Sequence, residues 1–218
     1  MNGIELASRF SFITNQLHFC GPGTAAKEFL QYMKKKDNTE NVRRALQRFE
    51  GLYPYLSTIA EKLGKDFLDY DVVEAYWIGN KHLEQFNDDD MKKIIKKLIS
   101  RGLPKSIGEK LIAHLPYGFF PHHDFNVFYV GVGRTTGSVE TTLQNMNNCR
   151  TSWGKILEIH GTQLIVASQS VLQQKGKYVL GKEETKTAVF IPEFLPKIKR
   201  GDIVALHWGF APVVLTTE

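Results

Sequence analysis

The heptapeptide CRTSWGK, residues 149–155, lies where the character of the sequence changes. Before it, polar residues follow a helix-like pattern, and after it the chain breaks up into short apolar runs rich in β-branched residues. The heptapeptide also holds Cys149, one of only two cysteines in the 218 residues. A thiol at such a junction makes this segment a candidate both for a domain boundary and for a functional site.

The segment after residue 150 predicts a small β domain. Turn residues separate six runs that favour strands: GKILEI, QLIVAS, GKYVL, TAVFIP, GDIVALHW and PVVLT. In GDIVALHW, His207 alternates with Leu206 and Trp208, so on a strand it would face away from them. Short strands in this number favour a small antiparallel barrel or sandwich that hides its edges by closing on itself.

The segment before residue 116 predicts helices. Apolar residues recur at helical spacing, as they do at Val42, Ala45, Leu46 and Phe49. The stretch NDDDMKK, residues 87–93, offers Asp residues to cap a helix and favour its N-terminus, and Gly102 with Pro104 marks the end of that helix and the start of the next. Tyr76 and Trp77 belong to an aromatic-rich helical stretch, which is typical of a core.

Residues 116–148 predict a connection between these parts. NVFYVGV, residues 126–132, has the composition of a strand, and SVETTLQNM predicts a helix that begins at Ser138. The glycine-rich VGVGRTTGS between them lacks the ending of a phosphate-binding loop, so we interpret it as a strand-to-helix turn. The predicted fold is therefore α+β, with an all-α domain at 1–115, a strand-helix segment at 116–148 and a β-barrel domain at 149–218.

Composition narrows the functional classes. The formal charge of +5 is spread thinly along the chain, so a nucleic-acid partner is not favoured. No apolar run reaches the roughly 20 residues of a membrane helix. Two distant cysteines without a secretory leader favour a cytosolic protein over a disulfide-stabilised secreted one.

Two motifs in the last 70 or so residues resemble the HypC/HupF family of hydrogenase-maturation chaperones. Members of that family begin with C-x-x-x-P-G-K and later read G-D-x-V-x-x-H-x-G-F-A. The positions that fit are Cys149, Gly154 and Lys155 in the first motif, and Gly201, Asp202, Val204, His207, Gly209, Phe210 and Ala211 in the second. The resemblance does not extend to residues 1–148.

The resemblance implies a small OB-like β-barrel that performs no turnover chemistry. Members of the family carry an iron with carbon monoxide and cyanide ligands. Together with an iron-sulfur maturation partner protein, they deliver it to the precursor of a hydrogenase large subunit. By resemblance, Cys149 and His207 correspond to the cysteine and histidine of the family. We therefore expect a metal-centre assembly chaperone or carrier, with iron as the expected metal.

The chemistry of these two side chains is consistent with that expectation. A thiolate is a soft ligand and imidazole an intermediate one, so together they favour iron, zinc or copper(I) over magnesium or calcium. The thiol must lose its proton to bind, and a nearby cation such as Arg150 or Lys155 would lower its pKa. The sequence departs from the family at Trp153, which replaces the proline, and in the internal position of Cys149.

Three residues outside the resembling part are further candidate metal ligands. FFPHHDF contains His122 and His123, and adjacent side chains on an extended segment point in opposite directions, so at most one of them is expected to join a given site. LHFCGPG contains Cys20, which could complete a metal site or lie beside Cys149.

Two other functions stay open at this point. An OB-like nucleic-acid-binding protein could use Trp153, Tyr178 or Phe190 to stack bases. A thiol enzyme could use Cys149 and His207 as nucleophile and base, although nothing in the sequence identifies an oxyanion hole. Cys149 could also be an ordinary buried cysteine.

Overall fold

The computed structural model describes residues 1–216, and the chain divides into two compact units. We call Met1–Thr141 the helical unit and Thr142–Glu218 the sheet unit. The predicted connecting segment, residues 116–148, is shared between the two units. Helices and strands are both present, so the α+β class is confirmed.

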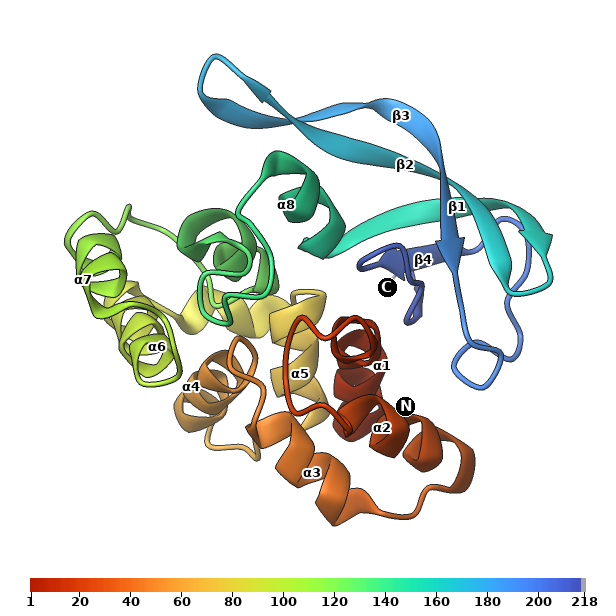
Figure 1. Ribbon diagram of the computed structural model, residues 1–218, viewed down its shortest axis with the longest axis horizontal. Coiled ribbons are helices and arrows are strands. Elements are labelled where there is room, and N and C mark those ends of the chain that lie inside the picture. Colours follow the sequence, from red (N-terminus) through yellow and green to blue (C-terminus); the bar gives the residue numbers. More distant parts are fainter. Residues whose placement is uncertain (217–218) are drawn as a thin grey trace. The chain divides into compact units, whose positions relative to one another are not determined.

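The helical unit contains the first seven α-helices, a 3₁₀ helix and a π-helix (Figure 1). Their bounds are α1 (Gly3–Gln16), α2 (Ala25–Lys35), α3 (Thr39–Gln47), α4 (Tyr53–Leu63), α5 (Tyr70–Trp77), η1 (Lys81–Gln85), α6 (Asp88–Ile99), α7 (Lys105–Ala113) and η2 (Phe125–Gly131). Helix α6 begins within NDDDMKK as predicted, but its capping residue is Asn87 and not an Asp: the Asn87 side chain accepts from the main-chain N–H groups of Asp89 and Asp90. Pro104 immediately precedes α7, as its position in the sequence predicted.

Aromatic side chains from several helices form the core of the helical unit. Phe10 of α1 stacks on Trp77 of α5 with ring centroids 4.7 Å apart. Tyr76 packs against both Trp77 and Tyr55, at 4.9 and 5.0 Å. Since Tyr76 and Trp77 are almost completely buried, the prediction that they belong to the core is confirmed.

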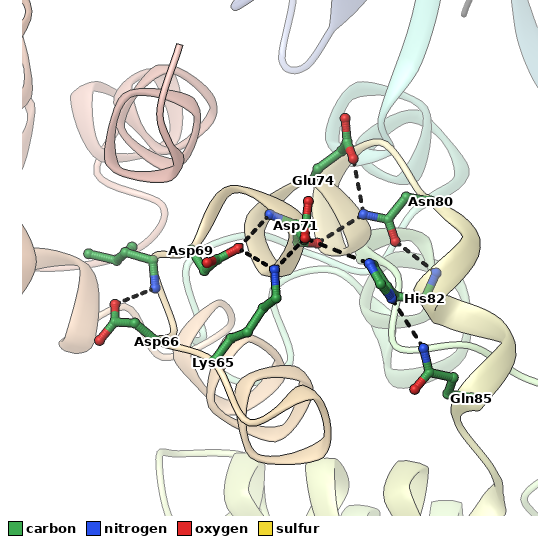
Figure 2. A network of polar contacts seen from close by, with 9 residues as sticks. Lys65, Asp66, Asp69, Asp71, Glu74, Asn80, His82 and Gln85 are labelled. Atoms are coloured by element: carbon green, nitrogen blue, oxygen red, sulfur yellow. Dashed lines mark hydrogen bonds and ion pairs between the residues drawn. The ribbon is translucent and has the colours of Figure 1, made fainter.

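A polar network fixes the chain before and after α5 (Figure 2). The ammonium group of Lys65 lies between the carboxylates of Asp69 and Asp71. Asn80 donates to the main-chain carbonyl of Asp71 at 2.9 Å and to the Glu74 carboxylate at 3.0 Å. It also accepts from the N–H of His82 at 3.1 Å, which caps η1. Asn80 is thus the residue that joins the end of α5 to η1.

The segment predicted as a strand at 126–132 is a π-helix, so that prediction is wrong. The main-chain N–H of Val132 bonds to the carbonyl of Val127, five residues earlier, at 3.2 Å. The aromatic rings of Phe125 and Tyr129 stack at 5.1 Å, and both contact Phe119. This packing overrides the strand preference of the valines and aromatic residues.

The helix expected from Ser138 begins later, as α8 (Leu143–Cys149). The Ser138 hydroxyl donates to the carbonyl of Phe19 at 2.7 Å and therefore caps no helix. Thr142 takes the capping position instead and accepts from the N–H of Asn145 at 3.2 Å.

The sheet unit combines α8 with a five-stranded sheet (Figure 1). The strands are β1 (Ser152–His160), β2 (Gln163–Gln174), β3 (Lys177–Val189), β4 (Ile203–Leu206) and β5 (Val214–Leu215). Their order is β3-β2-β1-β4-β5, and every neighbouring pair is antiparallel. GKYVL and TAVFIP, which we expected to form two strands, fall largely within the single strand β3.

The sheet is open, and the predicted closed OB-like barrel is not confirmed. The nearest approach to closure is an isolated parallel bridge between Val189, at the end of β3, and Phe210. The long β2–β3 hairpin explains the difference, because two strands of 12 and 13 residues extend past the shorter β1, β4 and β5. In the described part of the chain, no helix has both the length and the apolar character needed to cross a bilayer. The predicted cytosolic location stays a prediction.

Replacing Asn80 with Ala is expected to lower the free energy of unfolding by about 1–2 kcal/mol, because three hydrogen bonds are lost, one of them the cap of η1. Urea denaturation measures this. Gln85→Ala is the control, since Gln85 is exposed and contacts only the His82 ring in the same network; its effect should stay within about 0.5 kcal/mol. Equal effects of the two substitutions would contradict the role given to Asn80.

Candidate metal centre

Cys149 and His207 lie next to each other within the sheet unit. Cys149 is the last residue of α8, and His207 directly follows β4. The Cys149 Sγ and the His207 Nε2 are 3.9 Å apart, and the two residues are 7% and 1% exposed. The pair that the sequence predicted from positions 58 residues apart is therefore brought together in the fold.

A tight turn presents His207 to the cysteine. The N–H of His207 donates to the carbonyl of Phe210 at 2.9 Å, and the N–H of Phe210 donates back at 3.0 Å. The two residues between them, Trp208 and Gly209, have φ values of 52° and 68°, as in a type I′ hairpin turn. The strand thus ends at Leu206, so His207 and Trp208 do not alternate on a strand as expected.

A main-chain hydrogen bond holds this turn against α8. The N–H of Trp208 donates to the carbonyl of Asn148 at 2.6 Å. A left-handed conformation is costly for a bulky residue such as Trp208, on the order of 1 kcal/mol, and persists where the surrounding contacts enforce it. Because Asn148 precedes Cys149, and His207 precedes Trp208, the same bond sets the thiol beside the imidazole.

The separation of the two side chains is compatible with a shared metal ion. Bonds of about 2.3 Å to sulfur and about 2.0–2.1 Å to nitrogen, at a tetrahedral angle, place the two ligand atoms about 3.5 Å apart. The largest separation that these bonds permit is about 4.4 Å. The observed 3.9 Å lies between these values, whereas it is close to the upper limit for a hydrogen bond to sulfur.

A polar pocket of about 390 Å³ lies beside His207. Its walls are formed by side-chain amides of α8, hydroxyls of β1 and β2, and the His207–Gly209 turn. From β3 they include Glu184, Lys186, Thr187 and Ala188. One of those amides is already fixed: the Asn147 side chain both accepts from and donates to the main chain of Val171, at 2.7 and 2.8 Å. His207 is among the residues that line this pocket, whereas Cys149 is not.

The local electrostatics favour a cation. Cys149 ends α8, and the carbonyl end of a helix carries a partial negative charge that stabilises a cation and not a bare thiolate. The guanidinium of Arg150 donates to the carbonyl of Gln169, and its Nε contacts the side chain of Asn147 at 3.5 Å. Lys155 is exposed on β1. The two basic residues expected beside the thiol thus have other positions or partners.

The two adjacent histidines, His122 and His123, have different hydrogen-bond partners in the helical unit. The Nδ1 of His122 accepts from the N–H of Asp124 at 3.1 Å, and the ring also contacts main-chain groups of Trp77 and Ile78. Burial lowers the pKa of His122. Both sides of this imidazole are therefore used by its own unit, which is typical of a structural histidine.

His123 has a different arrangement. Its Nδ1 lies 2.8 Å from the hydroxyl of Tyr76, and this hydroxyl donates its single hydrogen to the carbonyl of Gly51 at 3.1 Å. Both contacts are satisfied only if Nδ1 of His123 carries a hydrogen and donates it to Tyr76. The lone pair of the neutral ring is then on Nε2. A second partner that fixes the tautomer in this way is usual for metal-binding histidines.

Cys20 is the least suited of the predicted ligands. Its thiol donates to the carboxylate of Glu50 at 3.6 Å, and burial raises its pKa to about 12. The same carboxylate accepts from the N–H of Gly21 at 3.0 Å, so it is held in place beside the sulfur. A metal at Cys20 would have to displace a proton that this environment retains. The prediction for Cys20 stays a prediction.

Of the three proposed stacking residues, Phe190 is buried at 7% exposure, and only Trp153 and Tyr178 are exposed, at 55% and 45%. A nucleic-acid interface would therefore have to use those two. Sequence reasoning missed Tyr76 as a functional candidate, because its aromatic neighbours indicated only a core. The contact that matters joins positions 47 residues apart.

A family model described as "Family of unknown function (DUF6390)" matches residues 1–218. The chain belongs to this family. No curated protein and no solved structure matches it. The DUF6390 match spans both the helical unit and the sheet unit.

The Cys149→Ala variant leaves Cys20 as the single thiol, which allows its pKa to be tested. Since the pKa is raised to about 12, the thiolate is scarce at pH 8, and alkylation by iodoacetamide should be at least about 100-fold slower in the folded protein than in urea. The folded rate should continue to rise with pH well beyond pH 9. Equal rates in both states, with a midpoint near 9, would contradict the assigned environment.

The Tyr76→Phe variant tests the tautomer of His123. In the metal-free wild-type protein, ¹⁵N chemical shifts should identify Nδ1 as protonated and Nε2 as unprotonated; without the Tyr76 oxygen, this preference should weaken or reverse. Tyr55→Phe is the matched control, because Tyr55 is also buried and its hydroxyl contacts Asn126 instead. A wild-type ring protonated on Nε2 would refute the assignment.

Proposed function

We propose that this protein binds a transition-metal ion through Cys149 and His207 and acts as a metal-centre assembly or carrier protein. The observation that carries the proposal is the 3.9 Å approach of the two ligand atoms, imposed by a main-chain hydrogen bond next to each residue. A thiolate with an imidazole selects for iron, zinc or copper(I) over hard cations. We take iron as the cargo, on the resemblance to the HypC/HupF family.

The residues that carry this resemblance divide into ligands and structural positions. Cys149 and His207 are the metal-binding pair. Gly154 allows close packing, because a Cβ there would lie 3.1 Å from side chains of Val166 and Leu206. Gly209 takes a left-handed conformation in the turn that presents His207. This combination of chemistry and scaffold supports the proposal more strongly than either ligand alone.

A carrier accounts for the burial of the site better than a thiol enzyme does. Reactive cysteines are usually exposed and lie at helix N-termini or next to cations. Cys149 is buried at a helix C-terminus. A cation neutralises the thiolate in that position, while a free nucleophile there lacks this stabilisation. The alternative of a Cys-His enzyme is thus the weaker one.

The proposed client follows from the resemblance alone. By that resemblance the iron carries carbon monoxide and cyanide, an iron-sulfur maturation protein is the partner, and the recipient is a hydrogenase large-subunit precursor. The helical unit lies outside the segment that resembles the HypC/HupF family, and we propose that it is a partner or delivery module.

Anaerobic metal binding tests the function. Wild-type protein should bind about one iron(II) per chain, and Cys149→Ala or His207→Ala should weaken binding at least about 100-fold through loss of a ligand. Cys20→Ala and His122→Ala are the controls and should bind like wild type. His123→Ala tests the sequence prediction that a histidine of FFPHHDF is a further ligand, and its affinity should fall while that of His122→Ala does not.

Infrared spectroscopy of protein purified anaerobically from its natural host tests the cargo. Bands of metal-bound carbon monoxide and cyanide are expected in wild type and should be absent in Cys149→Ala. Iron uptake that is the same in wild type and in both ligand variants would refute the metal-binding proposal. Normal iron binding without those bands would refute only the hydrogenase-type cargo.

A further inference from the structure

The outer edge of β3 has main-chain groups that can pair with another strand. β3 is the first strand in the sheet order, so only β2 pairs along its length. At its end, the N–H of Phe190 donates to Thr162 beside β2 at 3.0 Å, while the N–H of Val189 donates in the other direction, to Gly209 at 2.8 Å. Along a strand, the main-chain N–H and C=O groups of successive residues point alternately to one side and to the other. Glu183, Thr185 and Thr187 therefore direct their N–H and C=O groups outward.

These outward groups are open over a defined stretch. Within residues 1–216, no main-chain partner is found on the outer side of Glu183, Thr185 or Thr187, and their side chains are exposed. The stretch ends at Val189, which is bonded to Gly209 and Ala211. At the other end, the register shifts between the pairs Gln169–Glu183 and Val171–Leu180. An open and regular edge of this kind is a template for strand pairing.

The sequence of this edge is complementary to itself. When KEETKTA, residues 182–188, pairs with a second copy antiparallel about Thr185, each Glu184 lies opposite a Lys186 and each Glu183 opposite a Thr187. Opposite charges in directly facing positions stabilise a strand pair, and Thr-Thr pairs are also favourable. Centring the pair on Glu183 instead would place two carboxylates opposite each other. That register also places each Glu184 opposite a Lys182, so the two registers differ in the facing carboxylates, and the charge pattern favours a second copy paired about Thr185.

We propose that β3 mediates a two-fold symmetric homodimer, with Thr185 on the axis and the two β3 strands antiparallel. Thr185 exchanges two main-chain hydrogen bonds with its counterpart, and Glu183 exchanges two with Thr187 of the second copy. Within one chain Glu184 and Lys186 are already 3.4 Å apart, so in the dimer four charges alternate across the axis. The exposed side chains of Leu180 and Val189 border the paired stretch. The proposal goes beyond metal binding and does not depend on it.

Cysteine cross-linking tests the register. Directly opposed residues that exchange hydrogen bonds have Cα atoms about 5.5 Å apart, within the span of a disulfide. Under mild oxidation, Thr185→Cys should form a covalent dimer on a non-reducing gel. Thr187→Cys is the matched control, since each copy then faces Glu183 of the other, and it should stay monomeric on the gel. Cross-linking that is equal in both variants, or absent from both, would overturn the register.

Charge reversal tests the interface in the unmodified chain by sedimentation across a range of protein concentrations. Glu184→Lys places lysines opposite each other twice and should weaken dimerisation roughly tenfold or more. Glu184→Lys combined with Lys186→Glu restores the opposite pairs and should recover it to within about threefold. Thr185→Pro, which removes an outward N–H and none that bonds β2, should also weaken it, while Thr185→Val, which keeps that N–H and a β-branched side chain, should have a much smaller effect.

Three outcomes would overturn the proposal: a wild-type protein that is monomeric at all concentrations, a dimer indifferent to these substitutions, or an edge that pairs only with a strand of another protein. Circular dichroism of each variant shows that it has folded. The double charge reversal keeps the test decisive even if Thr185→Pro is unstable, because it changes no main-chain group.

Discussion

The hydrogen bond from the N–H of Trp208 to the carbonyl of Asn148 is the contact on which the candidate metal centre depends. It joins the end of α8 to the turn after β4. Cys149 directly follows Asn148, and His207 directly precedes Trp208. Together with the type I′ turn itself, it holds the backbone at Trp208 in a left-handed conformation that is unfavourable for a tryptophan. The bond thus places one side chain from each of two distant motifs, Cys149 and His207, next to each other.

The two halves of this arrangement stabilise each other. The turn needs Gly209 for its second left-handed position, and the sheet needs Gly154 so that β1 can lie close to β2 and β4. Burial of an uncompensated thiolate is costly, and the nearest helix end adds negative charge. A metal cation at this point removes both costs. Under the proposed function, the bound cation is what stabilises the thiolate at this helix end.

Parts of this account could be read from the sequence, and others could not. The start of α6 within NDDDMKK and the buried Tyr76 and Trp77 follow from local patterns, because side-chain capping and helical periodicity act over a few residues, although the cap is Asn87 and not the expected Asp. The π-helix at Phe125–Gly131 was missed, since its valines and aromatic residues favour a strand until they pack against their neighbours. The pairing of Cys149 with His207 was anticipated through a family resemblance, whereas the turn that brings them together was interpreted as a strand.

The same distinction separates the two histidines of FFPHHDF. Their sequence positions show only that the pair is a candidate, and the extended conformation expected there is not found, because His123 and Asp124 are helical. Which one carries a suitable lone pair depends on a tyrosine 47 residues away and on a main-chain carbonyl that takes the hydrogen of that tyrosine. Such long-range hydrogen bonding has no local signal in the sequence.

X-ray absorption spectroscopy of the iron-loaded protein tests the central claim most directly, because it reports the atoms bound to the metal. The account predicts a sulfur neighbour at about 2.3 Å together with imidazole nitrogen at about 2.0–2.1 Å, with the sulfur lost in Cys149→Ala and the nitrogen signal reduced in His207→Ala. A first shell of oxygen and nitrogen alone in the wild-type protein would contradict it.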